Sequence, residues 1–446
     1  MMPNPAEQQT VRPSRGRWSF SGQASGQAAG SVRTAGLALL LLTALNLFNF
    51  IDRYVLPGVQ PLIQKQFSVN DARMGTLTSA FFLTYMIAAP LTGWLGDRLP
   101  RKPLIVTGAL LWSVATLLTA AVHSYQSLLV RHAVVGIGEA TFSIFAPALL
   151  ADFYPEVDRN RVLSIFYVAI PVGAALGYIT GGVVGQRYGW KAPFYVSAAP
   201  GILIAIALML FIREPERGAA DRIAPTANRT TVAGLARNPG FWTGTLGMAA
   251  MVFSMGGISV WMPTFLVRYG GYSLANANLL LGGITIVDGF LGTWMGGWIA
   301  QRWLRTDHRA LYLLSAWSAL LAIPGAIAAF FGPRALLLPA LLIAEFFLFL
   351  NTGPLNAAIV NSVAAPVRST AIAINLFMIH ALGDLPSPAV IGHISDRSSL
   401  RLGLTSTLLS MAVAGVILML GSRFAPALPQ RGGNPAARGE PPMHTE

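Results

Sequence analysis

The chain contains no cysteine among its 446 residues, and only 11% of these are charged. Without cysteine, neither a disulfide framework nor a thiolate metal site is available. A soluble domain carries about a quarter charged residues, so a chain this poor in charge cannot easily cover a water-exposed surface. Apolar residues make up 54% of the sequence. A surface that faces lipid explains both values, and we expect an integral membrane protein.

Long apolar runs recur along the whole chain. A helix needs ~20 mainly apolar residues to cross a bilayer. The glycine, alanine and proline residues inside the runs are typical of helices that pack closely in lipid. The sequence therefore predicts an all-α membrane protein with twelve transmembrane helices. The expected spans are residues 35–56, 74–96, 103–123, 127–152, 161–186, 191–212, 241–267, 275–301, 309–331, 335–362, 368–395 and 401–423.

A charged segment divides the twelve spans into two sets of six. The first apolar run is too long for a signal peptide and contains Asp52 and Arg53, so we expect an uncleaved first helix. The expected parts are a disordered N-terminal tail, an N-terminal six-helix bundle, a linker, a C-terminal six-helix bundle and a C-terminal tail. They comprise residues 1–34, 35–212, 213–240, 241–423 and 424–446.

Basic residues are distributed unevenly between the two sides of the predicted membrane. Of the 31 Lys and Arg residues, 21 fall in the tails and loops on the side of the N-terminus and 8 in the loops on the other side. Cytoplasmic loops are enriched in Lys and Arg, so both termini are expected in the cytoplasm. The net charge of +13 is then a topology signal, and no nucleic-acid partner is expected. The composition favours a bacterial inner membrane.

Landmarks in the first six spans recur in the last six. Pro147 and Arg161 lie 14 residues apart, as do Pro354 and Arg368, and the offset between the two pairs is 207 residues. Transporters are often built from two parallel halves related by an axis along the membrane normal, with the substrate site between them. The repeat therefore predicts two pseudo-symmetric bundles.

Two motifs carry a family resemblance. The segment Gly93–Lys102 reads Gly-Trp-Leu-Gly-Asp-Arg-Leu-Pro-Arg-Lys, which resembles the loop 2–3 signature of the major facilitator superfamily, with Pro100 in place of the usual second glycine. Arg131 and Gly136–Ala140 resemble its fourth-helix signature. This resemblance covers essentially residues 35–423 and implies the major facilitator fold.

Within that superfamily the chain is most similar to the spinster family of lipid transporters. The carrying segments are Asn49–Tyr54, Gly136–Ala140, His380–Pro388 and Gly392–Asp396. The resemblance implies transport of an anionic amphiphile, a lysolipid or a sphingoid phosphate. A proton-coupled carrier of drugs or small organic anions is the alternative.

Four charged residues lie inside the predicted spans of helices 1 and 4. Asp52, Arg53 and Arg131 fall in the outer half of the membrane, and Glu139 lies ~12 Å deeper than Arg131, near the midplane. Intramembrane charges are costly and mark functional sites by default. We expect Asp52 and Glu139 to couple transport to protons, and Arg53 and Arg131 to bind the anionic group of the substrate. The alternative is a structural salt-bridge network that fixes the two helices.

The loop 2–3 signature suggests a gate. In the superfamily this loop latches the two halves in the outward-facing state, so Asp97, Arg98 and Arg101 are expected to act in gating. Asp152 and Arg161, at the inner ends of helices 4 and 5, are the expected latch partners. The alternative is an ordinary basic cytoplasmic loop.

The second half offers further candidates. His380 and Asp384 are four residues apart on one face of helix 11, and they form either a polar substrate contact or a packing pair. Trp261 and Phe346, with neighbouring aromatics, are candidates to line an apolar chamber for an acyl tail, although most such rings face lipid or other helices. Asp288 and Glu345 also lie within spans, but the sequence supplies no partner for either.

Other classes of function find less support. We find no Gly-x-Ser-x-Gly elbow, His-Glu-x-x-His motif or P-loop, so a membrane enzyme acting on lipids is disfavoured. No metal or cofactor is expected, because one His and one Asp supply too few ligands. The expected partners are a lipid or organic-anion substrate, protons and membrane lipids, and the expected assembly is a monomer. The sequence thus predicts a secondary active transporter that works by alternating access.

Overall fold

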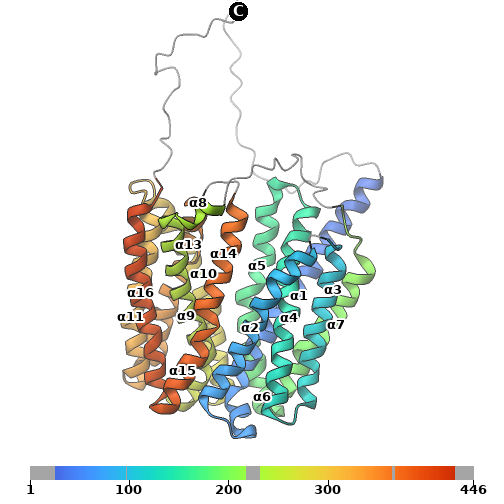
Figure 1. Cartoon of the computed structure of the whole chain (residues 1–446). Coiled ribbons are helices and arrows are strands. Elements are labelled where there is room, and N and C mark those ends of the chain that lie inside the picture. Colours follow the sequence, from blue (N-terminus) through green and yellow to red (C-terminus); the bar gives the residue numbers. More distant parts are fainter. Residues whose placement is uncertain (1–25, 97, 217–231, 364–366, 427–446) are drawn as a thin grey trace, which may run out of the picture.

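A computed structural model describes residues 26–96, 98–216, 232–363 and 367–426. These residues form long helices and contain no strand (Figure 1). Most of the helices run roughly parallel to one another, as expected for segments that satisfy their backbone hydrogen bonds internally while crossing lipid. The first described turns of α1 and the end of α16 lie at the same end of the molecule, called here the upper end after Figure 1. The opposite end is called the lower end.

The first half contains seven α-helices and two short irregular segments. Its elements are α1 (Gly26–Phe67), α2 (Asp71–Gly96), α3 (Arg101–Leu117), the 3₁₀ turn Leu118–Ala121, α4 (Tyr125–Phe153), α5 (Glu156–Ile179), the π-turn Thr180–Val184, α6 (Gly185–Tyr188) and α7 (Ala192–Phe211).

The second half follows the linker and is built in the same way. Its elements are α8 (Val232–Ala236), α9 (Pro239–Arg268), α10 (Leu274–Trp303), α11 (Ala310–Phe331), α12 (Arg334–Leu350), α13 (Thr352–Asn361), α14 (Arg368–Ile379), the π-turn His380–Asp384, α15 (Pro386–Arg397), α16 (Leu400–Gly421) and the 3₁₀ turn Ser422–Phe424.

Twelve helical segments cross the molecule. Eleven are long and apolar enough to span a membrane by themselves. The twelfth is α3, which has only 17 residues and is continued by the 3₁₀ turn Leu118–Ala121. Together they cover residues 101–121 and match the predicted third span. The twelve-helix plan predicted from hydropathy is confirmed.

Helix α1 is longer at both ends than predicted. It begins at Gly26, within the range expected to be a disordered tail, and it continues to Phe67 through Pro57 and Pro61. Proline removes a backbone hydrogen bond but does not always end a helix. Residues 1–25, most of the linker at 217–231 and the tail at 427–446 lie outside the described ranges, so those predicted boundaries stay predictions.

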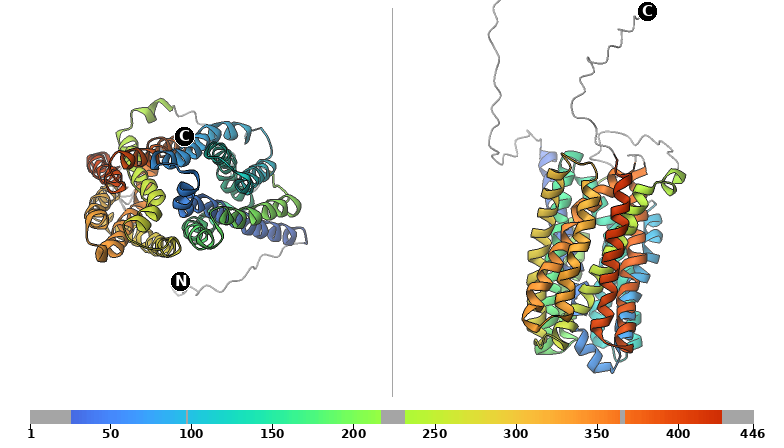
Figure 2. Two further views of the ribbon diagram at one scale, coloured as in Figure 1. Left: turned by 90° about the horizontal axis from the view of Figure 1, so that it is seen from below. Right: turned by 90° about the vertical axis from the view of Figure 1, so that its left-hand side faces the viewer.

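The two halves lie side by side and meet mainly at the lower end. The view from below separates the first half from the second, and the close pairs across the boundary are α2 with α15, α5 with α10 and α1 with α9 (Figure 2). Helix α14, which continues α15 toward the upper end, packs instead on α9 of its own half. The halves are therefore joined at one end.

Glycines permit the tightest crossings at this lower end. A Cβ atom at Gly75 of α2 would collide with the backbone of Pro388, and one at Gly392 of α15 would collide with the backbone of Asp71. On the other side of the molecule, the Asn278 side-chain amide of α10 donates to the Gly58 carbonyl of α1 at 3.1 Å. Small residues let helices approach in this way.

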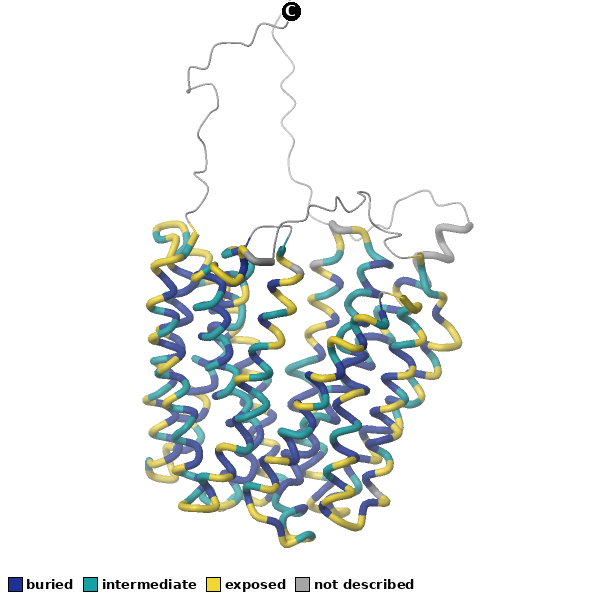
Figure 3. The backbone as a smooth tube through the Cα atoms, in the orientation of Figure 1, coloured by how far each residue is buried: buried dark blue, intermediate teal, exposed yellow. Residues whose placement is uncertain are grey.

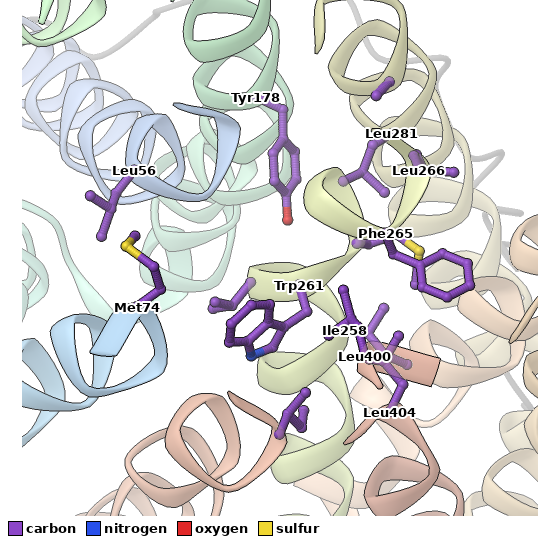
Figure 4. Close-up of a cluster of buried hydrophobic side chains, with 14 of the residues drawn as sticks. Leu56, Met74, Tyr178, Ile258, Trp261, Phe265, Leu266, Leu281, Leu400 and Leu404 are labelled. Atoms are coloured by element: carbon purple, nitrogen blue, oxygen red, sulfur yellow. The ribbon is translucent and has the colours of Figure 1, made fainter. Parts of the chain in front are cut away.

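A shared apolar cluster fills the space between these crossings. It includes Leu56 and Met74 of the first half and Ile258, Trp261 and Leu404 of the second (Figure 4). Because its members come from both halves, the cluster closes the lower end against water.

The outward faces are apolar. Buried residues concentrate where helices meet, and exposed ones follow the outer sides of the helices (Figure 3). Large apolar side chains are among the most exposed, including Leu91, Leu203, Phe211, Trp294 and Leu409. An apolar surface this extensive fits contact with lipid and not with water.

Candidate substrate cavity and gates

A cavity of about 270 Å³ lies between the two halves, above the apolar cluster. Both halves line it. Its polar lining includes Arg53, His132, Thr78, Ser259, Thr285, Glu345 and Asp384, and its apolar lining includes Phe81, Phe82, Val252, Ile258, Leu348 and Phe349. Such a mixture of apolar walls and a few convergent polar groups is typical of a ligand site.

Arg53 and Glu139 form the strongest charged contact at this cavity. The Arg53 Nε and Nη2 atoms donate to the same Glu139 oxygen, Oε2, at 3.0 and 2.6 Å. The Glu139 side chain is fully buried, whereas 18% of the Arg53 side chain is exposed. The guanidinium also lies 4.9 to 5.6 Å from the ring centroids of Phe50, Phe81 and Tyr85. The arginine is thus held by one carboxylate and by contacts with three aromatic rings.

Asp52 points away from the cavity. Thr116 of α3 and Ser197 of α7 both donate hydroxyl hydrogen bonds to its carboxylate, the latter at 2.9 Å. Successive residues on a helix point about 100° apart, so Asp52 faces α3 and α7 while Arg53 faces the cavity. The four charges predicted as one cluster on helices 1 and 4 therefore form hydrogen bonds in two groups, and the groups still interact through the charges of Asp52 and Arg53.

Arg131 belongs to the Asp52 side of this division. It is only 8% exposed, and its guanidinium lies 5.2 Å from the Phe194 ring centroid. Its Nε and Nη2 atoms have no hydrogen-bond partner among the described residues, while Asp52 is the carboxylate whose charge acts on it. Arg131 does not line the central cavity.

His132 was not singled out from the sequence, although it lines the cavity. Its ring stacks on Phe81 at 5.3 Å. In the sequence, only its position next to Arg131, on a helix that carries other charged candidate residues, indicated a role for it.

His380 and Asp384 come together as their spacing predicted. Nδ1 of His380 lies 2.7 Å from Oδ2 of Asp384. The two residues begin and end a π-turn, and α15 starts at Pro386, so the helix is distorted beside its prolines as expected. The His380 ring also packs on Phe82 and Tyr85 of α2, with centroids 5.8 and 5.5 Å apart. This pair therefore bridges the halves.

Two of the aromatic residues predicted to line an apolar chamber lie away from the cavity. Trp261 is fully buried and donates its indole N–H to the Pro388 carbonyl at 3.1 Å, so it packs α9 against α15. Phe346 packs on Phe347, with centroids 5.5 Å apart. Neither lines the cavity, whereas Phe349, another of the predicted aromatic residues, does.

An ion pair joins the halves at the lower end, and the sequence did not predict it. Nη1 and Nη2 of Arg268, the last residue of α9, donate to both carboxylate oxygens of Asp71, the first residue of α2. Gln64 and Ser395 also donate to Asp71, at 2.6 and 2.5 Å. The Asp71 carboxylate thus accepts hydrogen bonds from three other helices, α1, α9 and α15.

Asp396 supports the same closure. Its two carboxylate oxygens accept the backbone N–H groups of Asp71 and Ala72, each at 2.9 Å. These N–H groups begin α2, where the positive end of the helix dipole favours a negative charge. The signal was present in the sequence, since Gly392 to Arg397 repeats the Gly-x-x-x-Asp-Arg spacing of the loop 2–3 motif.

The residues predicted to form a gate lie at the upper end. Arg101 pairs with Asp152, and the Glu214 carboxylate accepts the backbone N–H groups of Arg101 and Lys102 at the start of α3. These contacts stay within the first half. Arg98 lies 3.9 Å from the Trp94 ring centroid. Arg161 lies in the first turns of α5, and Asp97 lies outside the described residues.

A family model of the Major Facilitator Superfamily matches residues 42–383. Protein spinster homolog 1 of Bos taurus is 35% identical over 421 residues, covering 89% of this chain and 78% of the relative. The chain belongs to the spinster family of the major facilitator superfamily. It is a membrane transporter and not an enzyme, in keeping with these relatives.

Other spinster relatives extend the comparison. The sphingosine-1-phosphate transporter SPNS2 of Danio rerio is 34% identical over 388 residues, covering 82% of this chain and 77% of the relative. A crystal structure of a bacterial homolog to the human lysosomal transporter spinster, inward-facing and unoccupied, matches with a TM-score of 0.80 at 24% identity, covering 88% of this chain and 98% of that one. This structural match supports the spinster fold.

Proposed function

We propose that the protein moves an anionic amphiphile of the lysolipid or sphingoid phosphate class across the membrane by alternating access, coupled to protons. The single observation that supports this most strongly is the cavity between the halves. It combines an arginine at its wall with apolar and aromatic sides, and it lies above a sealed lower end. An anionic headgroup with an apolar tail matches that combination.

The Arg53–Glu139 pair suggests how proton and anion are exchanged. Both hydrogen bonds from Arg53 go to Glu139 Oε2, so Glu139 Oε1 is not bound by the guanidinium. A proton that binds Glu139 cancels its charge and weakens its hold on Arg53. The guanidinium, which stays protonated, then binds the phosphate of the substrate. One proton and one negative charge enter together, so the buried site keeps its net charge.

The volume of the cavity supports a division of the substrate between the cavity and the space above it. A volume of about 270 Å³ lies slightly below the ~300 Å³ at which ligand pockets usually begin. The cavity therefore takes the headgroup and the first carbons of the chain. The rest of the tail extends toward the upper end, where α14 does not pack closely on the first half.

The charge bias of the sequence supports an orientation. The upper end carries both termini of the described chain and the loops rich in Lys and Arg, so it faces the cytoplasm, and we place the protein in a bacterial inner membrane. The closed lower end then supports an inward-facing state. The expected functional unit is the monomer, because each chain contains its own cavity.

Uptake into proteoliposomes tests the function. Lysolipids and small organic anions are compared, with and without an imposed pH gradient, for the unaltered protein, Asp52→Asn, Glu139→Gln and the control Asp307→Asn in an exposed loop. Uptake of the lysolipid above that of the small anions, with a pH response lost in Glu139→Gln, is expected. Preference for the compact anions instead supports the drug or organic-anion carrier. If both carboxylate variants keep the original pH response, the proton coupling is wrong.

A further inference from the structure

Arg131 lines a second pocket, on the outside of the first half. This pocket has a volume of about 550 Å³ and is formed by the lower part of α3, the 3₁₀ turn that continues it and the first turns of α4. Helices α3 and α4 pack on each other, and α3 also packs on α7 (Figure 1). The residues that line the pocket all belong to the first half and are mainly apolar. The pocket is therefore separate from the central cavity between the halves.

The walls of the pocket are continuous with the lipid-facing surface. Leu118 and Val130, which line it from the two sides, are both exposed. Leu111 and Val114 of α3 and Ile137 of α4 are exposed as well, and their spacing of three or four residues places them on the same helix faces as the pocket residues, nearer the upper end. A molecule that enters this pocket therefore comes from the bilayer, with room for an acyl chain along α3 and α4.

Arg131 is the one charged group in the wall of this pocket. It is only 8% exposed, its Nε and Nη2 atoms have no hydrogen-bond partner among the described residues, and it forms no ion pair with any of them. The Asp52 carboxylate, whose charge acts on it, accepts its hydrogen bonds from Thr116 and Ser197 instead. A buried guanidinium with donors to spare is costly unless a ligand accepts from it.

The position of this guanidinium along the membrane normal fits a lipid headgroup. Helix α4 begins at Tyr125, at the lower end, and Arg131 lies six residues or about 9 Å above it. Side chains on a helix lean toward its N-terminus, so Arg131 leans back toward the lower surface. Its guanidinium lies 5.2 Å from the ring centroid of Phe194, in the first turn of α7. The charge is therefore close to the level at which spanning helices end and headgroups begin.

We propose that this pocket binds one anionic phospholipid from the leaflet at the lower end. Its phosphodiester lies on Arg131, because a guanidinium matches phosphate oxygens in geometry and charge. Gln126 and Ser127, exposed at the rim of the pocket, contact the rest of the headgroup, and the positive end of the α4 dipole adds to the attraction. This lipid stays bound and is not transported, so the inference is independent of the proposed function.

Lipid binding to the purified full-length chain in detergent, counted by native mass spectrometry, tests the pocket. The probes are phosphatidylglycerol and diacylglycerol with the same acyl chains, which differ in the phosphodiester headgroup. We expect the unaltered protein to retain one phosphatidylglycerol and to bind diacylglycerol at least tenfold more weakly. Arg131→Gln should weaken phosphatidylglycerol binding about tenfold, and Arg131→Lys, which keeps the charge, should recover part of it.

A second variant tests the pocket without altering the arginine. Val130→Trp fills the pocket from α4 and should also remove the retained phosphatidylglycerol. Its control is Val416→Trp on the exposed face of α16, and the control for the loss of charge is Arg334→Gln, an exposed arginine at the same end. Neither control should change retention. Thermal unfolding shows which variants fold, and Val130→Trp decides alone if Arg131→Gln does not.

Three results would overturn the proposal. Equal binding of the two probes would show that the pocket holds only an acyl chain. Unchanged retention in both Arg131→Gln and Val130→Trp would place the bound lipid elsewhere on the surface. If inorganic phosphate raises the Tm of the lipid-free protein, if Arg131→Gln abolishes that rise, and if phosphatidylglycerol is not retained, the occupant is a free anion and not a lipid.

Discussion

Asp71 and Arg268 connect the two halves of the transporter at the lower end by two parallel hydrogen bonds of 2.7 and 2.6 Å. Asp71 begins α2 and Arg268 ends α9, so the pair joins one helix terminus of each half. A bidentate pair of this kind fixes orientation as well as distance. It can exist only while the lower end is closed.

Removing this pair should favour opening of the lower end. The Arg268 side chain is 37% exposed, so solvent screening limits the contribution of the pair to about 1 kcal/mol. Arg268→Gln is therefore expected to raise the population open at the lower end about fivefold. Because the chain has no cysteine, a single Met255→Cys in the cavity wall reports the change through labelling by a membrane-impermeant maleimide added from each side.

A matched control uses Arg334→Gln at the same end. Arg334 lies 5.5 Å from the Tyr272 ring centroid, and it forms no ion pair with a described residue. The charge swap Asp71→Arg with Arg268→Asp should restore part of the original labelling. Equal labelling of Arg268→Gln and Arg334→Gln would show that the pair does not hold the gate.

The glycine crossings should resist any added side chain. In Gly75→Ala the new Cβ atom meets the backbone of Pro388, which cannot move aside alone. We expect a cost of about 1–3 kcal/mol to the closed lower end, seen as increased labelling of Met255→Cys from the lower side. Gly93→Ala, on the same helix with open space around it, should leave the labelling unchanged.

Substituting Glu139 should make the affinity for the anionic substrate independent of pH. Glu139→Gln imitates the protonated carboxyl, so Arg53 is permanently available to the anion. Binding of the anionic substrate should then stay at its low-pH level as the pH rises, whereas binding to the unaltered protein should weaken when Glu139 loses its proton. Titration of substrate affinity from pH 5 to 9 measures this, and a parallel pH response in the variant would contradict the exchange.

Loss of the upper-end pair Arg101–Asp152 should mainly lower the stability of the fold. It joins α3 to α4 within one half, so Asp152→Asn is expected to lower the free energy of unfolding by about 1 kcal/mol and the Tm by about 2 °C. The gating role predicted from the motif is tested separately with Asp97→Asn. A shift in Met255→Cys labelling for Asp97→Asn, but none for Asp152→Asn, would assign the latch to Asp97.

Hydropathy was enough to predict the helices because each span has to bury its backbone in lipid, whatever its neighbours are. Helix ends were harder. The predicted first span ends at residue 56, just before Pro57, yet α1 continues to Phe67. Packing of its lower part on Gly181 and Asn278 stabilises turns that local sequence preference would have ended.

The site was predicted less completely, because depth along a helix does not give direction around it. Asp52 and Arg53 are neighbours in sequence but face different helices. The four predicted charges therefore form their hydrogen bonds in two groups. The His380–Asp384 contact was foreseeable from spacing, whereas depth grouped Arg53 with Arg131 and not with Glu139, the residue that it contacts. The Asp71–Arg268 pair joins residues 197 apart, and only the docking of the halves brings them together.

The two π-turns have a mechanical consequence. One follows α5 and the other follows α14, so each half contains a π-turn in its fifth spanning helix, at the boundary between the halves. A π-turn accommodates an extra residue and weakens the regular backbone bonding, which makes it a natural place for a helix to bend. Below the second turn α15 is clamped to α2, while above it α14 is not. The second turn is thus a flexure point above the lower seal, at which the upper part of the second half can tilt, whereas the first turn packs on Asn278 of α10 and lies within the seal.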